Sequence, residues 1–392
     1  MNSQLKSSMA KVSALTRSGK LHEATRMIQS LLVGSAPADA ATDDLSGVGA
    51  LIDGEYTEVD PAPAAHAVEA PLGRKSAKTN GRTTTLAQTL RKIAAGGMPL
   101  RGPLSGVGVP VPQGAQFLAL THSTAQGSRS YRLYIPANRP AGPMPLIVML
   151  HGCTQNAEDF AAGPGMNALA EEFGLLIAYP TQPSGANAQK CWNWYRPEDQ
   201  ARDRGEPAVI AGIAQDIQRD HGADRARTYV AGLSAGGAAA AVMAAAYPEV
   251  FRAVGVHSGL PAGGARDIPS AFAAMRGGSK GKPHQTIVPT IVFHGRADTT
   301  VHSDNGAAVL EQAIQAMPGL RVTTRRGVSA GGRGYSATGH TDSDGRSLAE
   351  IWEIDGAGHA WAGGNLSGSY TDPEGPDASR EMVRFFLQHK QP

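Results

Sequence analysis

The chain has 392 residues, of which 41% are hydrophobic, so it can bury the core of one large domain or of two smaller ones. Its 36 basic and 34 acidic residues nearly balance, which gives no electrostatic basis for a nucleic-acid partner. Two cysteines are too few for a disulfide framework or a four-ligand zinc site, and no apolar run approaches the roughly 18 residues of a membrane span, so we expect no metal, no cofactor and no transmembrane segment.

Residues 1–33 are predicted to form a short amphipathic helix, because apolar residues between Leu15 and Leu32 recur at helical spacing. The stretch lacks the continuous apolar segment of a secretory signal. A cytoplasmic location is therefore expected, with secretion by another route left open. The helix is expected to pack on its own domain or a partner chain, with docking on a hydrophobic granule or membrane surface and a transit peptide as alternatives.

Residues 34–110 are predicted to be a low-complexity linker. They are rich in alanine, proline, glycine and charge and show no sustained period, so they cannot bury enough surface to fold. A short helix is expected near residues 85–96, ending in glycines. The catalytic domain is expected to cover residues 111–392.

Strand-like and helical segments alternate through this domain. Two strand-like runs separated by a polar turn within QFLALTHSTAQGSRSYRLYIPANRP, residues 116–140, predict a hairpin. Further along, PLIVMLHGC, LLIAYP, RTYVAG, AVGVHSG, TIVFHG and LAEIWEIDG read as buried strands with helical segments between most of them. The alternation predicts an α/β fold with a mostly parallel central sheet and helices on both faces. Functional groups gather at the carboxyl ends of such strands.

Two stretches match G-x-S-x-G, the pattern of an activated serine: GLSAGG around Ser234 and GVSAGG around Ser329. In a chain with 48 glycines the pattern alone is weak. Ser234 follows an apolar strand and precedes an alanine-rich helix, as a nucleophile elbow requires, and Gly232 and Gly236 would relieve crowding around it. No helix follows Ser329, which is predicted to lie in a polar hairpin loop. Ser234 is therefore the predicted nucleophile.

Asp298 is the predicted acid of the site. α/β-hydrolases order the nucleophile, the acid and the histidine along the chain, and Asp298 directly follows the buried strand TIVFHG. Asp304 is better explained as a helix N-cap. Asp355 lies too close in sequence to the preferred histidine.

His359 is the predicted base, because it alone among the downstream histidines follows a strand on a glycine-rich loop. His302 is expected to be a structural neighbour of Asp298. His340 is expected in the polar loop of Ser329, and His389 in solvent at the end of the C-terminal helix.

Nucleophilic attack by Ser234 creates an oxyanion that needs two preorganised N–H donors. The amide of Ala235, directly after the nucleophile, is one candidate. The amide of Cys153, in the loop HGC after an earlier strand, is the other. His151 in that loop is expected to be structural.

Several segments together resemble the poly(3-hydroxybutyrate) depolymerase and feruloyl/acetylxylan-type esterase family of α/β-hydrolases. They are LHGCTQNAEDF, CWNWYRPEDQARDRGEPAVI, GLSAGGAAAAVMAAAYPEVF, VGVHSGLPAG, VFHGRADTTV, GAGHAWAGG and SYTDPEGPDASREMVRFF, between residues 115 and 390. The resemblance implies that Ser234, Asp298 and His359 form a catalytic triad. It also suggests a disulfide between Cys153 and Cys191, although a reducing cytosol would oppose one.

Four aromatic residues are candidates for contact with a hydrophobic acyl group, with buried packing as the alternative. They are Trp192, Trp194, Tyr195 and Trp361. The expected function is a serine carboxylic-ester hydrolase that degrades poly(3-hydroxybutyrate) or its oligomers through an acyl-enzyme. The alternatives are a feruloyl, acetyl or general short-chain esterase, an acyltransferase, and an inactive granule-binding protein.

Overall fold

A computed structural model of the chain describes residues 109–282 and 286–390. The predicted helix at 1–33, the helix near 85–96 and the linker up to residue 108 lie outside the described residues. None of the helices in the described ranges is long and apolar enough to cross a membrane.

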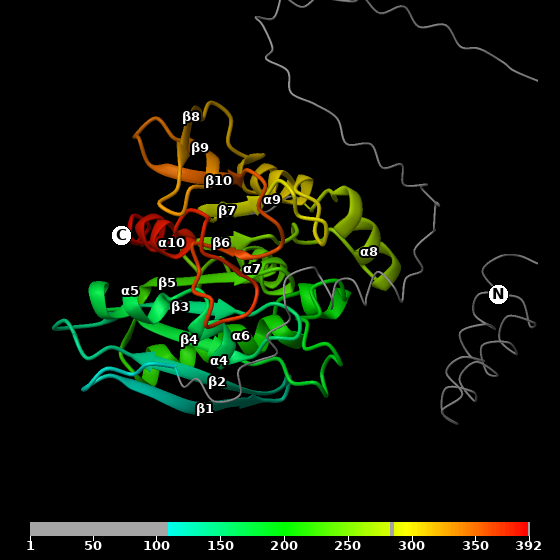
Figure 1. Ribbon diagram of the computed structural model, residues 1–392. Coiled ribbons are helices and arrows are strands. Elements are labelled where there is room, and N and C mark those ends of the chain that lie inside the picture. The colour runs from blue at the N-terminus through cyan, green and yellow to red at the C-terminus, as the bar shows by residue number, and fades with distance from the viewer. Residues whose placement is uncertain (1–108, 283–285, 391–392) are drawn as a thin grey trace, which may run out of the picture. The chain divides into compact units, whose positions relative to one another are not determined.

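One large sheet forms the centre of the described domain (Figure 1). The strands at its centre, β4, β3, β5, β6, β7 and β10, run parallel, and antiparallel strands extend the sheet at both sides, which confirms the predicted mostly parallel sheet. In spatial order the strands are β1 (Gln116–Thr124), β2 (Gly127–Ile135), β4 (Leu176–Pro180), β3 (Met144–Leu150), β5 (Ala223–Leu233), β6 (Val254–His257), β7 (Thr290–Gly295), β10 (Ser347–Ile354), β9 (Gly334–Thr341) and β8 (Arg321–Val328).

Helices cover both faces of the sheet, so each central strand is buried on both sides. Along β3, Leu146, Val148 and Leu150 join one core cluster, and the alternate residues Ile147 and Met149 join the other. This period of two follows from the pleat of a strand. The first cluster includes residues of α6 (Gly205–Asp220), α7 (Ala235–Ala246), α8 (Ile268–Gly277) and α9 (Asp304–Ile314); the second includes α4 (Ala157–Ala162), α5 (Met166–Phe173) and α10 (Ala378–Leu387).

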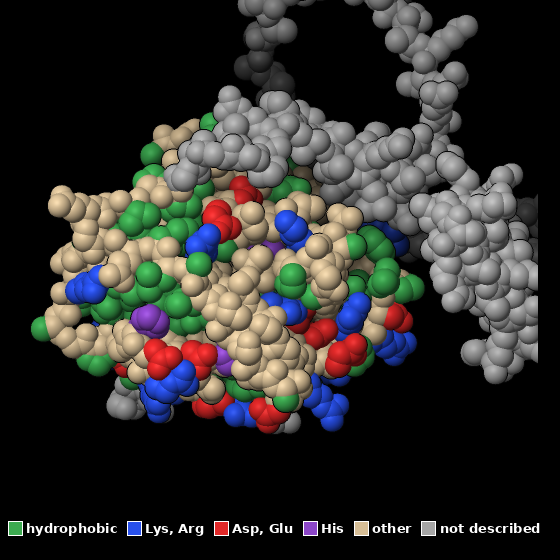
Figure 2. Space-filling view, turned by 90° about the horizontal axis from the view of Figure 1, so that it is seen from below, with side chains coloured by type: hydrophobic (Ala, Val, Ile, Leu, Met, Phe, Trp, Pro, Cys, Tyr) green, Lys and Arg blue, Asp and Glu red, His purple; other side chains and the backbone are tan. Residues whose placement is uncertain are grey.

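The surface carries charges of both signs. On the face drawn in Figure 2, acidic and basic side chains lie interspersed, and hydrophobic side chains gather in separate patches. This mixture accords with the near balance of 36 basic and 34 acidic residues in the chain.

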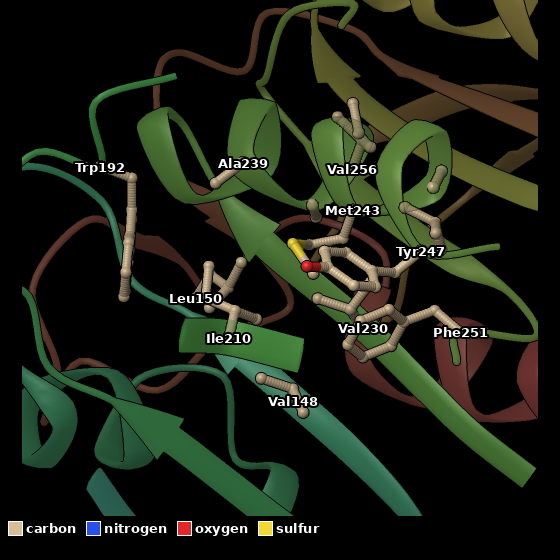
Figure 3. Close-up of a cluster of buried hydrophobic side chains, with 14 of the residues drawn as sticks. Val148, Leu150, Trp192, Ile210, Val230, Ala239, Met243, Tyr247, Phe251 and Val256 are labelled. Carbon is tan, nitrogen blue, oxygen red and sulfur yellow. The ribbon is translucent and has the colours of Figure 1, made fainter. Parts of the chain in front are cut away.

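The alanine-rich helix α7 packs directly on the central strands (Figure 3). Its Ala239 and Met243 belong to the same buried cluster as Val230 of β5 and Val256 of β6. Small side chains let the helix approach closely: a Cβ atom on Gly237 would come within 2.9 Å of the carbonyl oxygen of His257. The position of α7, and with it the residue that precedes it, is therefore fixed by backbone contact.

The C-terminal helix α10 covers the opposite face of β5. The ring of Phe386 stacks on Tyr229 with 5.0 Å between centroids, and the Tyr229 hydroxyl donates to the carbonyl of His389 over 2.8 Å. The prediction that His389 is solvated is wrong. Its ring lies 4.6 Å from that of Phe385, and burial lowers the pKa of His389 to about 4.

The second G-x-S-x-G stretch forms the turn between β8 and β9, which confirms the predicted hairpin loop. The same prediction is wrong for His340, which lies within β9 and is buried. The turn is held in place, because the Ser329 hydroxyl donates to the carbonyl of Glu374 and a Cβ on Gly331 would meet the Glu374 Cα at 2.4 Å. Arg333 adds an ion pair with Asp372 at 2.8 Å. This motif serves packing.

Candidate active site

Ser234 occupies a strained turn between β5 and α7. Its φ of 58° and ψ of −119° lie in a region that non-glycine residues rarely adopt. A Cβ on Gly232 would come within 2.4 Å of the Gly236 carbonyl, and one on Gly236 within 2.0 Å of the carbonyl oxygen of Leu150. Both glycines are thus needed for the tight turn, which confirms the predicted elbow. Ser234 is half-buried and lies at the N-terminus of α7, where the helix dipole stabilises developing negative charge.

Asp298 follows β7 and pairs with His359. Its Oδ2 atom lies 2.7 Å from Nδ1 of His359, which the chain places 61 residues later. Its Oδ1 atom accepts the amides of Thr300 and Val301 at 2.8 and 2.9 Å. The carboxylate is therefore fixed by its own loop and presents one oxygen to the imidazole.

The surroundings of Asp298 keep it ionised. Burial alone would raise the pKa of this carboxyl, but the neighbouring His294 and His359 side chains and the Val301 amide together hold the pKa well below its usual range. His294 donates through Nε2 to the carbonyl of Val301 at 2.9 Å and lies 3.6 Å from Oδ2. An ionised Asp298 accepts from Nδ1–H of His359, which leaves Nε2 of His359 as the basic nitrogen.

The rival groups lie in other surroundings. Asp355 is exposed and pairs with Arg296 at 2.8 Å. Asp304 is exposed and opens α9 as its first residue, after the N-cap Ser303, so its prediction as the cap is wrong by one position. His302, half exposed, lies 3.4 Å from Asp304 and so does not partner Asp298. In contrast to His302, His359 lies with Nδ1 at hydrogen-bond distance from Asp298.

The loop after β3 lies against the nucleophile. A Cβ on Gly152 would be 3.6 Å from the Cβ of Ser234, and the Gly152 amide donates to Oε1 of Gln155 at 2.9 Å. The amide of Cys153 has no acceptor among the described residues. The amide of Ala235, at the first position of α7, has no intrahelical acceptor. These two N–H groups meet the requirement for oxyanion donors, and their role stays a prediction.

His151 stabilises the loop after β3, which carries the predicted oxyanion donor Cys153 and is called the oxyanion loop below. Burial lowers the pKa of His151 to about 4, so the imidazole is neutral at pH 7. Nδ1–H donates to the carbonyl of Gly152 at 2.7 Å, and Nε2 accepts the amide of Gln182 at 3.0 Å. This matches the structural role predicted for His151.

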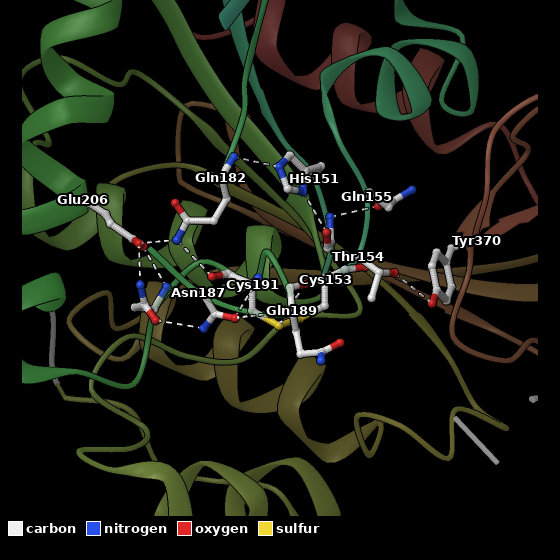
Figure 4. Close-up of a disulfide and its surroundings, with 12 residues drawn as sticks. His151, Cys153, Thr154, Gln155, Gln182, Asn187, Gln189, Cys191, Glu206 and Tyr370 are labelled. Carbon is white, nitrogen blue, oxygen red and sulfur yellow. Dashed lines mark hydrogen bonds between the residues drawn. A yellow bond between two sulfur atoms is a disulfide. The ribbon is translucent and has the colours of Figure 1, made fainter. Parts of the chain in front are cut away.

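A disulfide joins Cys153 of the oxyanion loop to Cys191 (Figure 4). The loop that carries Cys191 is held by buried Glu206, which accepts the Asn193 amide at 2.7 Å and a hydrogen bond from the Gln182 side chain. Gln182 also donates to the carbonyl of Cys191 at 3.0 Å. One continuous network therefore fixes both loops beside Ser234.

Most of the predicted aromatic contacts are core residues. Trp192 and Trp361 are fully buried and Trp194 is 6% exposed, so these three rings follow the alternative of buried packing. Trp361 donates from its indole to the Ser379 hydroxyl at 3.0 Å and meets the ring of Phe160 edge-on at 5.6 Å. Burial of these large rings stabilises the fold. Tyr195 remains half-buried, and its contact with substrate stays a prediction.

Two residues near the oxyanion loop were not predicted. Thr154 and Tyr370 both have left-handed backbones, with φ of 68° and 53°, and the Tyr370 hydroxyl lies 3.3 Å from Oγ1 of Thr154. The carbonyl of Tyr370 accepts the amide of Trp361 at 2.7 Å. Tyr370 thus connects the segment after His359 to the oxyanion loop. The motif SYTDPEGPDAS was the only sequence signal at this position.

The chain resembles characterised esterases in sequence and fold. The family model described as Esterase PHB depolymerase matches residues 129–330. Over 305 residues the chain is 32% identical to poly(3-hydroxyalkanoate) depolymerase C of Paucimonas lemoignei, covering 74% of this chain and 70% of that protein. Over 140 residues it is 31% identical to feruloyl esterase B of Thermothelomyces thermophilus, covering 36% of this chain and 47% of that protein. An acetyl xylan esterase from Aspergillus awamori matches with a TM-score of 0.52 at 20% identity, covering 70% of this chain and 99% of that one, which supports the α/β-hydrolase fold.

Proposed function

Since the chain belongs to the esterase PHB depolymerase family, we propose that it is a serine carboxylic-ester hydrolase acting on poly(3-hydroxybutyrate) or its oligomers. The observation that carries the proposal is the pairing of Asp298 with His359 at 2.7 Å, in a domain that also holds Ser234 in a strained elbow. The relative of which the chain covers 70% is named as a poly(3-hydroxyalkanoate) depolymerase, which supports the polyester as substrate.

The reaction begins when the Ser234 hydroxyl attacks the ester carbonyl and Nε2 of His359 takes its proton. The carbonyl oxygen becomes an oxyanion that the Cys153 and Ala235 amides stabilise. Asp298 stays ionised, keeps the imidazole in the correct tautomer and stabilises its charged form. The tetrahedral intermediate collapses, His359 returns the proton to the leaving alcohol, and an acyl group remains on Ser234.

Water completes the cycle. His359 removes a proton from water, the resulting hydroxide attacks the acyl-enzyme, and a second oxyanion occupies the same donors. Collapse releases the carboxylic acid, and the proton on His359 returns to Ser234.

The test compares two substrates on the same protein. Release of 3-hydroxybutyrate from amorphous polymer is measured beside release of ferulate from methyl ferulate. Activity on the polymer with little on methyl ferulate is expected. Activity on the ferulate alone would move the substrate to the class named by the feruloyl esterase relative.

A Ser234→Ala variant tests the mechanism. Hydrolysis should fall to the level of the uncatalysed reaction plus the residual effect of the oxyanion donors, a loss of about 10⁶ in kcat for a triad of this kind. Hydrolysis by this variant at the rate of the wild-type protein would refute the triad. If the wild-type protein binds the polymer but hydrolyses no ester, an inactive binding protein would be favoured. Ester products formed with added alcohol would reveal an acyltransferase.

We also propose that residues 1–33 bind the surface of a hydrophobic polymer granule in the cytoplasm. The support is the helical spacing of apolar residues in this segment. A chain lacking residues 1–33 should sediment less with amorphous granules than the full chain and should hydrolyse a soluble short-chain ester equally fast. Equal sedimentation of the two chains would reject the proposal.

A further inference from the structure

We propose that His257 is a positioning residue that holds the three loops of the catalytic triad in their mutual arrangement. His257 ends β6, the strand between β5, which leads to Ser234, and β7, which leads to Asp298. The inference rests on the proposed function, because it assumes that Ser234, Asp298 and His359 react together.

The main chain of His257 holds the nucleophile. Its carbonyl accepts the amide of Ser234 at 2.9 Å, at the residue whose backbone is strained. The residue after His257 is also strained: Ser258 has a φ of 49°, and its amide donates to the carbonyl of Phe293 at 2.8 Å. The end of β6 is therefore fastened to the nucleophile elbow on one side and to β7 on the other.

The imidazole of His257 holds the histidine loop. Nε2 accepts the main-chain amide of Ala362, three residues after His359, at 3.0 Å. Because Nε2 accepts, the proton of the neutral ring is on Nδ1, which donates to the Ser258 hydroxyl at 3.1 Å. Burial lowers the pKa of His257 to about 3, which keeps Nε2 free of a proton at neutral pH.

Aromatic packing fixes the ring on both sides. The imidazole stacks on Trp361 with 5.0 Å between centroids and on Phe293 with 5.8 Å. Phe293 pairs with His257 across β6 and β7 and lies five residues before Asp298. The ring of His257 thus lies between the segment after His359 and the strand that leads to Asp298.

His257 is fully buried, and burying its polar imidazole costs desolvation free energy that an apolar side chain would not cost. A leucine would bury as much apolar surface but would leave the Ala362 amide without an acceptor inside the protein. The histidine therefore has a function at this position that an aliphatic side chain cannot provide. Asp298 holds the His359 ring by its hydrogen bond to Nδ1. The Ala362 amide holds the main chain that follows His359. Loss of the Ala362 contact should therefore let the loop that carries His359 shift.

The experiment measures kcat per active site, with Ser234 titrated by a fluorophosphonate and p-nitrophenyl butyrate as substrate. His257→Leu should lower kcat by about 100-fold, the cost of a misplacement of about 1 Å in an active site, with KM changed by less than about threefold. His257→Gln places an amide oxygen near the position of Nε2 and should recover most of this loss, whereas the shorter His257→Asn should not.

His122→Leu is the matched control. His122 is also buried, at 6% exposure, but lies in the edge strand β1 and bonds Asp216 at 2.6 Å. This variant should lower Tm and leave kcat per titrated site unchanged. Wild-type kcat in His257→Leu, or equal losses in His257→Gln and His257→Asn, would overturn the proposal. If His257→Leu does not fold, the Gln and Asn variants alone decide it. An active Ser234→Ala variant would instead refute the proposed triad.

Discussion

The side-chain amide of Gln155 donates to the main-chain carbonyl of Ser369, 3.1 Å away in space and 214 residues away in sequence. The other end of the same side chain accepts the amide of Gly152 at 2.9 Å. Gln155 is buried and also donates to Asp159 at 2.9 Å. It therefore ties the oxyanion loop to the segment that follows His359.

Gln155→Leu should lower kcat without a comparable change in KM. The variant frees the Gly152 amide and lets the loop that carries the Cys153 amide shift, and loss of one oxyanion donor costs about 10²–10³ in kcat. Kinetics on p-nitrophenyl butyrate, corrected by active-site titration, measure the effect. Gln126→Leu, at an exposed position in the β1–β2 turn, is the control. A rise in KM alone would show that Gln155 acts on substrate binding.

Asp298→Asn should lower kcat by about 10⁴, because an amide no longer fixes the tautomer of His359 or stabilises its charged form. The loss should appear in kcat and in kcat/KM alike, since ground-state binding does not depend on Asp298. Asp355→Asn removes an exposed carboxylate paired with Arg296 and should stay within about twofold of wild type. Similar losses in the two variants would contradict the assignment of Asp298 as the acid.

Stability should fall as the pH drops from about 6.5 toward 4. Burial lowers the pKa of His151 and His389 to about 4 and that of His257 to about 3, whereas an unfolded histidine titrates near 6.5. Within this window the unfolded chain binds more protons than the folded one, so the free energy of unfolding decreases as the pH falls. Well above pH 6.5 these histidines are neutral in both states and contribute no pH dependence.

His389→Gln isolates one of these protons. The slope of unfolding free energy against pH, measured by urea titration between pH 4.5 and 6, should become shallower by up to about 1.4 kcal/mol per pH unit. A slope unaffected by the His389 variant would show that this side chain titrates normally in the folded protein.

Substitution of Trp361 should lower stability, and substitution of Tyr195 should weaken substrate binding. Trp361→Ala removes a fully buried ring and should cost about 3–5 kcal/mol of unfolding free energy. Tyr195→Ala, at a half-buried position, should raise KM for oligomers of 3-hydroxybutyrate and change Tm little. Denaturant unfolding and steady-state kinetics on both variants measure the two effects. An unchanged KM in the Tyr195 variant would remove it from the substrate site.

The order of the catalytic groups was predictable because each group follows a strand. Ser234 directly follows the buried end of β5 and Asp298 lies in the loop after β7, and parallel strands bring such ends to one edge of a sheet. Gly232 and Gly236 were predictable too, since the elbow leaves no room for a Cβ. The contacts of Gln155 and His257 were not, because their partners lie 214 and 105 residues away and no local pattern specifies them.

The errors have physical causes as well. Strands β8 and β9 were not among the predicted strands, and His340 was therefore expected in a loop. Strand β8 reads RVTTRRGV and is exposed along most of its length, so it lacks the apolar alternation that marks a half-buried strand. Trp361 was a candidate for substrate contact because it follows His359 closely, yet its side chain is buried and the chain pairs β11 (Trp361–Ala362) with β12 (Thr371–Asp372) there. Closeness in sequence to a catalytic residue does not determine whether a side chain faces the active site or the core.

The position of α10 has a consequence for synthesis of the protein on the ribosome. Residues 378–387 are made after all the strands of the large sheet, yet Phe386 covers Tyr229 in the strand that leads to the nucleophile, and a Cβ on Gly255 would touch the sulfur of Met382. Until this segment emerges, the face of β5 and β6 that it covers stays open to solvent and to other nascent chains. Folding of the sheet is therefore completed only after α10 has been made, and a premature stop before residue 378 leaves this face of the sheet uncovered and prone to aggregation.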